Sequence, residues 1–88
     1  MAKSLILIEV KTTLETADVR KHIRQLEQYR CCADVRGDKR RFVGAVAGAV
    51  VEGEAMDFAH ENGMYVIVQS GKAVKIVPVP EGFQVKKW

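Results

Sequence analysis

The sequence predicts an α/β domain with the element order β-α-β-α-β-β and a mixed sheet. Two runs rich in aliphatic and β-branched residues, 4–11 and 42–51, show no helical period and are typical of buried strands. Between them, apolar residues recur at spacings of three and four. A strand, a helix and a strand in this order favour a parallel pair with a right-handed crossover. Near the end, Ser70-Gly71 indicates a hairpin turn, which adds an antiparallel strand.

Length and composition limit the possible classes of protein. The chain has 88 residues, so we expect one domain spanning 1–88. Hydrophobic residues make up 48% and charged residues 28%, which excludes a disordered or fibrous chain. The longest uncharged stretch, 42–51, is too short to cross a bilayer, and 1–10 lacks the features of a signal peptide. We therefore expect a cytoplasmic protein without a membrane partner.

The first strand is expected over Ser4 to Lys11. Its apolar residues occupy both faces, which predicts a central strand that is covered on both sides. Because side chains alternate along a strand, Glu9 and Lys11 should share one face at its C-terminal end.

The first helix is expected from Ala17 to about Cys32. Its N-cap should be one of Thr12, Thr13 and Thr16, and its inward residues are expected to be Val19, Ile23, Leu26 and Tyr29 or Cys32. His22 is expected to be an exposed polar residue of this helix. The adjacent Cys31 and Cys32 should be free thiols that pack at the helix end, without a zinc site.

After the first helix, the sequence predicts a turn and four more helices and strands. A turn over 34–41 should lead into the strand 42–51, followed by a helix over 53–61 that Asn62-Gly63 ends in a left-handed conformation. A third strand over 64–69 and an outer strand over 73–77 should form the hairpin. The tail is expected to pack back through Phe83 or Trp88.

The net charge of +3 is unevenly distributed. Residues 20–41 hold eight basic residues against three acidic ones, whereas 1–19 and 42–88 each carry a net charge of −1. A basic helix and loop can attract phosphate, although they can equally be a solvated helix face. The basic residues are Arg20, Lys21, Arg24, Arg30, Arg36, Lys39, Arg40 and Arg41.

The tripeptide Glu9-Val10-Lys11 is the pattern most suggestive of chemistry. A carboxylate can bind a hard divalent cation while a lysine beside it orients a water molecule, but a simple ion pair at a strand end has the same pattern. Gln25 and Tyr29 lie four residues apart on the next helix and should share one of its faces.

These residues resemble the PD-(D/E)XK phosphodiesterase superfamily, particularly its RecB-like branch. Its pattern is an acid-x-Lys strand, a helix with Gln-x-x-x-Tyr, and a further strand. The stretch from Val43 to Trp88 is also similar to the C-terminal end of uncharacterised nuclease-like proteins of prokaryotes. The resemblance implies a restriction-endonuclease-like core that lacks the N-terminal helix and first two strands of the family.

The function implied by this resemblance is metal-dependent cleavage of nucleic acid, DNA rather than RNA. Glu9 would be a magnesium ligand, Lys11 would position a water molecule, and Gln25 and Tyr29 would contact the site or the substrate. The residues expected to bind nucleic acid are Arg20, Lys21, Arg24, Arg40 and Arg41.

The aspartate that shares the metal in this family has no counterpart in positions 1–8. The chain could be a fragment, a relative without catalysis, or a subunit that obtains the missing strand from another chain. Asp18, Asp34, Asp38 and Asp57 are possible substitutes, each expected on a helix or loop. The alternative functions are a non-catalytic module that binds nucleic acid and a dimerisation module. We expect a homodimer in either case, through pairing near Ser4 to Lys11 or exchange of a terminal element.

Overall fold

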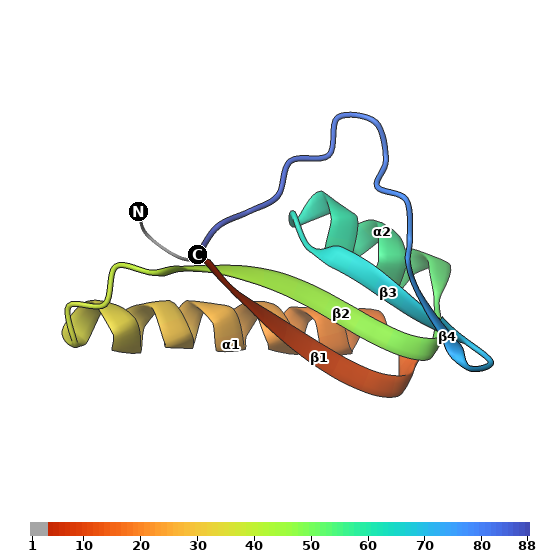
Figure 1. The fold of residues 1–88 in the computed structure, drawn as a ribbon, viewed down its shortest axis with the longest axis horizontal. Coiled ribbons are helices and arrows are strands. Elements are labelled where there is room, and N and C mark those ends of the chain that lie inside the picture. Colours follow the sequence, from red (N-terminus) through yellow and green to blue (C-terminus); the bar gives the residue numbers. More distant parts are fainter. Residues whose placement is uncertain (1–3) are drawn as a thin grey trace.

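The computed structural model describes residues 4–88 and contains six helices and strands. Their order is β-α-β-α-β-β, so the predicted α/β architecture is confirmed (Figure 1). Predicted and observed boundaries agree to within a few residues, and the helix over 53–61 agrees at both ends. The elements are β1 (Ser4–Leu14), α1 (Thr16–Val35), β2 (Arg41–Val51), α2 (Gly53–Glu61), β3 (Tyr65–Ser70) and β4 (Ala73–Ile76).

The four strands form one sheet in the order β1-β2-β3-β4. Strands β1, β2 and β3 are parallel, and β4 is antiparallel to β3, which confirms the mixed sheet. In the β1–β2 pair, Glu9 lies opposite Val46 and Lys11 lies opposite Gly48. The acid-x-Lys strand is therefore fixed in register against the small-residue strand β2.

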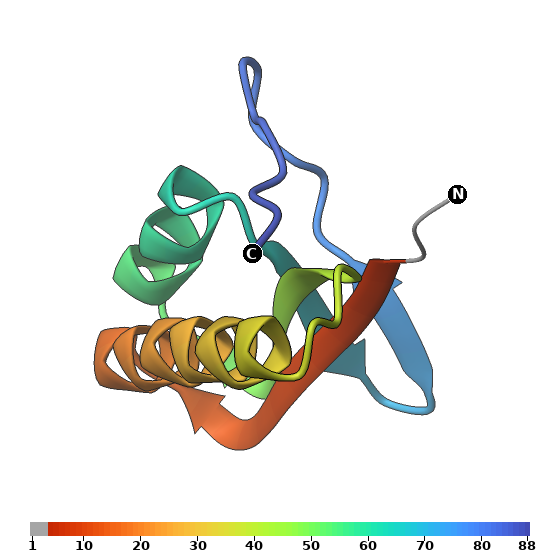
Figure 2. The ribbon, with the colours of Figure 1, turned by 90° about the vertical axis from the view of Figure 1, so that its left-hand side faces the viewer.

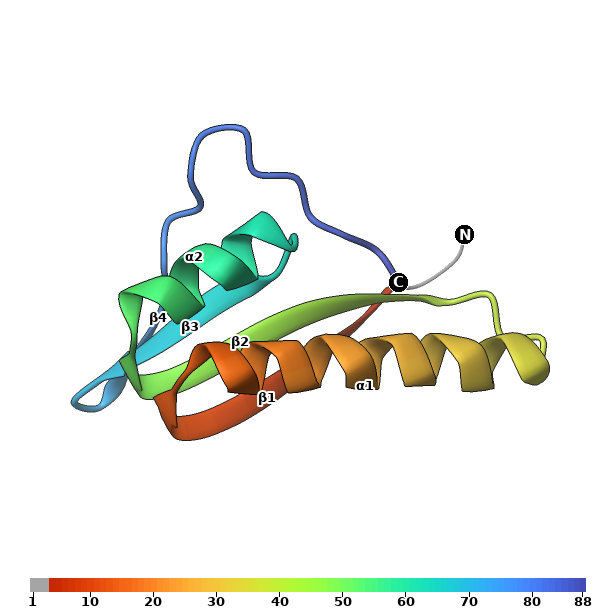
Figure 3. The same cartoon turned by 180° about the vertical axis from the view of Figure 1, so that it is seen from behind.

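Both helices lie on the same face of the sheet (Figure 2). Parallel connections are almost always right-handed, and here two of them advance across the sheet in the same direction. Helix α1 runs along β1 and β2, and α2 lies beside β3 (Figure 3). The largest fully buried side chains are Leu14, Val19, Leu26, Val46, Met64 and Val66.

Gly44 shows how tightly the helices pack on β2. A Cβ atom at this position would lie 2.7 Å from Leu26 Cδ1 and 2.9 Å from Met64 Sδ. Glycine therefore permits the close approach of the core side chains to the strand.

The prediction that the first strand is central and covered on both sides is wrong. Among residues 4–88, β1 pairs with β2 alone and lies at one edge of the sheet. Its side chains Ile6, Ile8 and Val10 are 62%, 50% and 70% exposed on the face without helices. Apolar residues on both faces correctly predicted a strand. Such a pattern does not reveal whether another element covers each face.

The N-terminus of α1 also differs from the expectation. The N-cap is Glu15 rather than a threonine, and it forms a capping box with Asp18. His22 is buried, which corrects its expected exposure, whereas Tyr29, Cys31 and Cys32 are exposed. The two cysteines are free thiols, as predicted, but they do not pack in the core.

The C-terminal segment returns to the sheet, as predicted (Figure 1). Trp88 is buried and exchanges two backbone hydrogen bonds with Phe42, at 2.7 and 2.8 Å. Gly63 has φ of +74° and ends α2 as expected. Its carbonyl accepts a hydrogen bond from the Lys86 N–H, which holds the returning segment against the start of β3. Across residues 4–88, none of the helices has the length and hydropathy needed to span a membrane.

Candidate active site

Glu9 and Lys11 lie on the face of β1 that carries Leu5 and Leu7, which turns toward α1. Glu9 is half-buried and Lys11 is exposed. Both lie before the end of the strand, which continues to Leu14 instead of ending near Lys11 as predicted. The helix that follows β1 runs back along it, so the first turns of α1 lie near these two side chains (Figure 3). The prediction that they share one face agrees with this arrangement.

Asp18 adds a second carboxylate to this part of the strand. Its Oδ1 lies 3.9 Å from the Lys11 Nζ, and its Oδ2 accepts a 2.9 Å hydrogen bond from the Glu15 N–H. The sequence analysis treated Asp18 as a possible substitute on a helix, but it did not foresee this approach to Lys11. The acid three residues after Glu15 is a capping signal that could have placed Asp18 in the first turn.

His22 connects α1 to the middle of β1. Its Nε2 lies 2.9 Å from the Leu7 carbonyl oxygen, and its Nδ1 lies 3.4 Å from Gln25 Oε1. These partners explain why a histidine that is 3% exposed is tolerated in the core. No acidic residue adjacent to His22 in the sequence could orient its ring, but the Leu7 carbonyl on another element serves as its partner.

Gln25 and Tyr29 share a shallow depression on α1, as their spacing predicts. Gln28 and Cys32 complete this depression, whose volume is about 290 Å³. Tyr29 is 53% exposed, and its ring centroid lies 6.3 Å from that of Phe42. Gln25 is therefore tied to β1 through His22, whereas no described contact brings Tyr29 to Glu9 or Lys11.

Two carboxylates near Lys11, those of Glu9 and Asp18, are the candidate ligands for a metal ion. Within 4–88 there is no group of three or more His, Cys, Asp and Glu residues that could hold one. Magnesium, however, is commonly bound through one or two carboxylates together with substrate phosphates. Glu9 and Asp18 supply carboxylates of this kind, and so the residues fit magnesium only when a phosphodiester contributes further ligands.

Several of the basic residues have structural contacts. Arg30 donates to Asp34 and to the carbonyls of Arg40 and Asp38, and its guanidinium lies 5.3 Å from the Phe42 ring centroid. Arg40 pairs with Asp38 at 2.6 Å. Arg41 donates to the Lys87 carbonyl at 2.9 Å.

The exposed basic residues lie mainly in the first half of α1. Arg20, Lys21 and Arg24 are all exposed, although the Arg20 guanidinium also lies 5.4 Å from the Phe58 ring centroid. Lys21 and Arg24 have no hydrogen bond or ion pair among the described contacts. These two residues are thus the best placed to meet an external phosphate.

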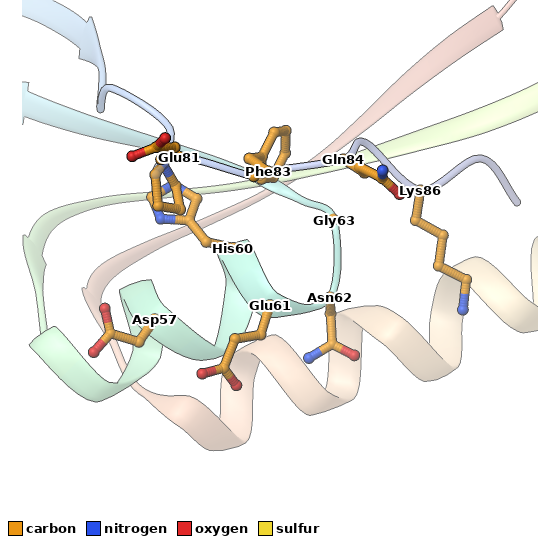
Figure 4. A pocket seen from close by; sticks show the side chains of 11 residues that line it. Asp57, His60, Glu61, Asn62, Gly63, Glu81, Phe83, Gln84 and Lys86 are labelled. Carbon is orange, nitrogen blue, oxygen red and sulfur yellow. The ribbon is translucent and has the colours of Figure 1, made fainter.

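A larger cavity of about 710 Å³ lies between the end of α2 and the C-terminal segment (Figure 4). Its walls include His60, whose ring meets that of Phe83 edge to face at 5.8 Å between centroids. The carboxylates of Asp57, Glu61 and Glu81 also line it. Of the residues linked to phosphodiester chemistry in the sequence, the lining of this cavity includes Asp57, one of the possible substitutes for the missing aspartate.

Comparisons with protein-family models, with curated proteins and with solved structures find no match to this chain. The functional conclusion therefore depends on the arrangement of the residues themselves.

Proposed function

We propose that this chain is a metal-dependent nuclease-like domain that hydrolyses phosphodiester bonds of nucleic acid, with DNA as the preferred substrate. The observation that carries this proposal is the shared placement of Glu9 and Lys11 on one face of the C-terminal half of β1, with the Asp18 carboxylate 3.9 Å from the lysine ammonium. Two carboxylates can hold a divalent cation, and that cation together with the lysine would stabilise the negative charge of a reacting phosphodiester. Glu9 and Lys11 resemble the acid-x-Lys pattern of the PD-(D/E)XK superfamily, and this resemblance suggests phosphodiester hydrolysis as the reaction.

Each residue has a role that follows from its chemistry. Glu9, with Asp18 as the nearest second carboxylate, would hold a magnesium ion, which when bound supplies Lewis-acid polarisation and an activated water. Lys11 contributes a positive charge that would stabilise the pentacoordinate transition state at phosphorus and orient the attacking water. Gln25, whose Oε1 lies 3.4 Å from His22 Nδ1 on the same helix, would contact the substrate backbone. Tyr29 contacts substrate further along α1.

A cleavage assay tests this function. The native chain is incubated with supercoiled plasmid and with single-stranded DNA and RNA, in the presence of magnesium or manganese. We expect divalent-dependent cleavage that falls by about 100-fold or more in Glu9→Gln and in Lys11→Ala. Glu61→Gln, which removes an exposed carboxylate on α2, is the matched control and should remain active. Absence of cleavage by the native chain, or activity retained in both variants, contradicts the proposal.

A second candidate is a non-catalytic module that binds nucleic acid. It is favoured by Lys21 and Arg24, which are exposed on α1 beside Gln25 and its depression. Phosphate contacts by such side chains give binding without sequence preference. Either activity would operate in the cytoplasm, the expected location, where Cys31 and Cys32 stay reduced.

A further inference from the structure

The face of the sheet opposite the helices is apolar and open in residues 4–88. Five large side chains on it are 50% to 70% exposed, in contrast to the buried face under α1 and α2. They come from both edge strands, so the exposed surface crosses the sheet. These side chains are Ile6, Ile8, Val10, Val74 and Ile76.

The strand register places mostly uncharged residues on this face, with Arg41 opposite Ser4 and Lys87 opposite Val43 as the charged ones. The inner strands contribute alanines 45, 47 and 49 from β2, and Tyr65, Ile67 and Gln69 from β3. The lysines of β4 near this region, including Lys75, alternate with Val74 and Ile76 and so belong to the other face. The middle of the face is therefore apolar, while Arg41 and Lys87 lie together where β1 and β2 begin, and Lys11 borders the apolar part toward the other end of β1.

The shape of the face suits a second apolar sheet. The alanine row of β2 lies lower than the larger side chains on either side, and it forms the floor of a groove of about 540 Å³. Ile8 and Val10 border this groove on one side, and Ile67 and Val74 border it on the other. Large side chains of an opposing face can fill such a groove, as in stacked sheets whose side chains interdigitate.

The exposed area is close to the requirement of a stable dimer. The five large side chains alone expose on the order of 400 Å² of apolar surface per copy. Ala47, Ala49 and the β3 residues of the same face add to this area, whereas Ala45 is buried. Stable interfaces usually bury roughly 800 Å² per partner.

We infer that two copies of this chain associate through their open sheet faces, forming a homodimer with the helices outside and the two sheets stacked inside. A twofold axis parallel to the strands places β2 of each copy opposite β3 of the other, so that each Ile67 lies over the alanine row of its partner copy. This contact is isologous and therefore closes at two copies. It differs from the edge pairing expected from the sequence, and it does not depend on the proposed nuclease function.

Light scattering coupled to gel filtration tests this inference at micromolar concentrations of the native chain. We expect a mass about twice the 9.8 kDa of one chain. Ile8→Lys and Ile76→Lys each place a charge on the open face, and each should weaken association at least tenfold. Val35→Lys is the matched control, because Val35 is apolar and 85% exposed on α1, away from the sheet face. The control should remain dimeric.

Ile76→Lys also separates face contact from edge pairing, because β4 and β1 lie at opposite edges of the sheet. A dimer that survives both lysine variants overturns the face-to-face arrangement and points to the β1 edge. A native mass near 9.8 kDa overturns the dimer and leaves the face to a different partner. Far-UV circular dichroism identifies any variant that fails to fold, in which case the other lysine variant and the native mass still decide the outcome.

Discussion

The Arg30 side chain donates hydrogen bonds to acceptors in three parts of the chain. Arg30 is one of the eight basic residues of 20–41, which the sequence groups as a surface that can attract phosphate. In the structure its side chain is only 16% exposed and is bound by acceptors of the same chain. Its Nη1 lies 2.6 Å from the Arg40 carbonyl and 3.5 Å from that of Trp88. Arg30 therefore joins α1, the loop before β2 and the C-terminus.

Replacing this residue should lower stability. Arg30→Lys keeps the charge but loses the planar fork that reaches several carbonyls at once. We expect a loss of about 2 kcal/mol in the free energy of unfolding, measured by denaturant titration. Arg24→Lys, on the exposed face of the same helix, should change it by less than about 0.5 kcal/mol. Equal effects of the two variants would show that the Arg30 contacts contribute nothing specific.

The Asp38–Arg40 pair predicts a pH dependence. Hydrogen bonds from the Arg40 side chain and backbone N–H hold the pKa of the Asp38 carboxyl well below its ordinary value of 3.8. A lowered pKa in the folded state stabilises the protein above the unfolded value, and this contribution is lost as the pH falls through the folded pKa. Thermal unfolding should show the native chain as more stable than Asp38→Asn at neutral pH. The difference should shrink below about pH 3.8, and a constant difference would contradict the ion pair.

The candidate site could be predicted only in part from its residues. The two-residue spacing of Glu9 and Lys11 and the four-residue spacing of Gln25 and Tyr29 each fix a shared face, because both depend on local geometry. The approach of Asp18 to Lys11 depends on how α1 folds back along β1. The burial of His22 likewise depends on the Leu7 carbonyl of another element. Such long-range partners leave no periodic signal in the sequence.

At the scale of elements, α1 combines a packed face with an exposed basic face. Val19, His22 and Leu26 are buried against the sheet, whereas Lys21 and Arg24 are exposed. Periodicity predicted the helix and most of this division. It failed at Tyr29 and Cys32, because the second half of α1 extends along the start of β2, where fewer elements cover it (Figure 3).

The basic face predicts salt-dependent binding of nucleic acid. Fluorescence anisotropy with a labelled oligonucleotide should show affinity that falls as salt rises, because counterions are released from the phosphates. Lys21→Glu with Arg24→Glu should weaken binding by about tenfold or more and flatten the salt dependence. Arg20 is left unchanged, since its contact with Phe58 also joins the two helices.

The control for this experiment is a double variant with the same change of net charge at a site outside α1. Lys72→Glu with Lys75→Glu reverses two exposed lysines on the β3–β4 hairpin, away from α1. It should reduce affinity much less than the α1 variant. Equal losses from the two double variants would mean that net charge, and not the basic face, governs binding.

At the scale of the whole molecule, the two crossovers place both helices on one side and leave an apolar face on the other (Figure 2). The order of elements was predictable because each strand and helix has its own pattern and the connections are short. The one-sided coverage was not predicted, because an apolar strand face looks the same in sequence whether a helix, a second copy or solvent meets it. The candidate chemical site and the proposed association surface adjoin at Lys11, which also lines the groove of the open face.

The most direct test of the proposed function is the position of a bound divalent ion. Manganese is added to the isotope-labelled chain with a short, non-cleavable oligonucleotide, and paramagnetic broadening of the amide signals is recorded by NMR. We expect broadening centred on Glu9, Lys11 and Asp18 that requires both manganese and oligonucleotide and is lost in Glu9→Gln. Broadening centred instead on Asp57, Glu61 and Glu81 of the larger cavity, or unchanged in Glu9→Gln, would contradict a nuclease site in the C-terminal half of β1.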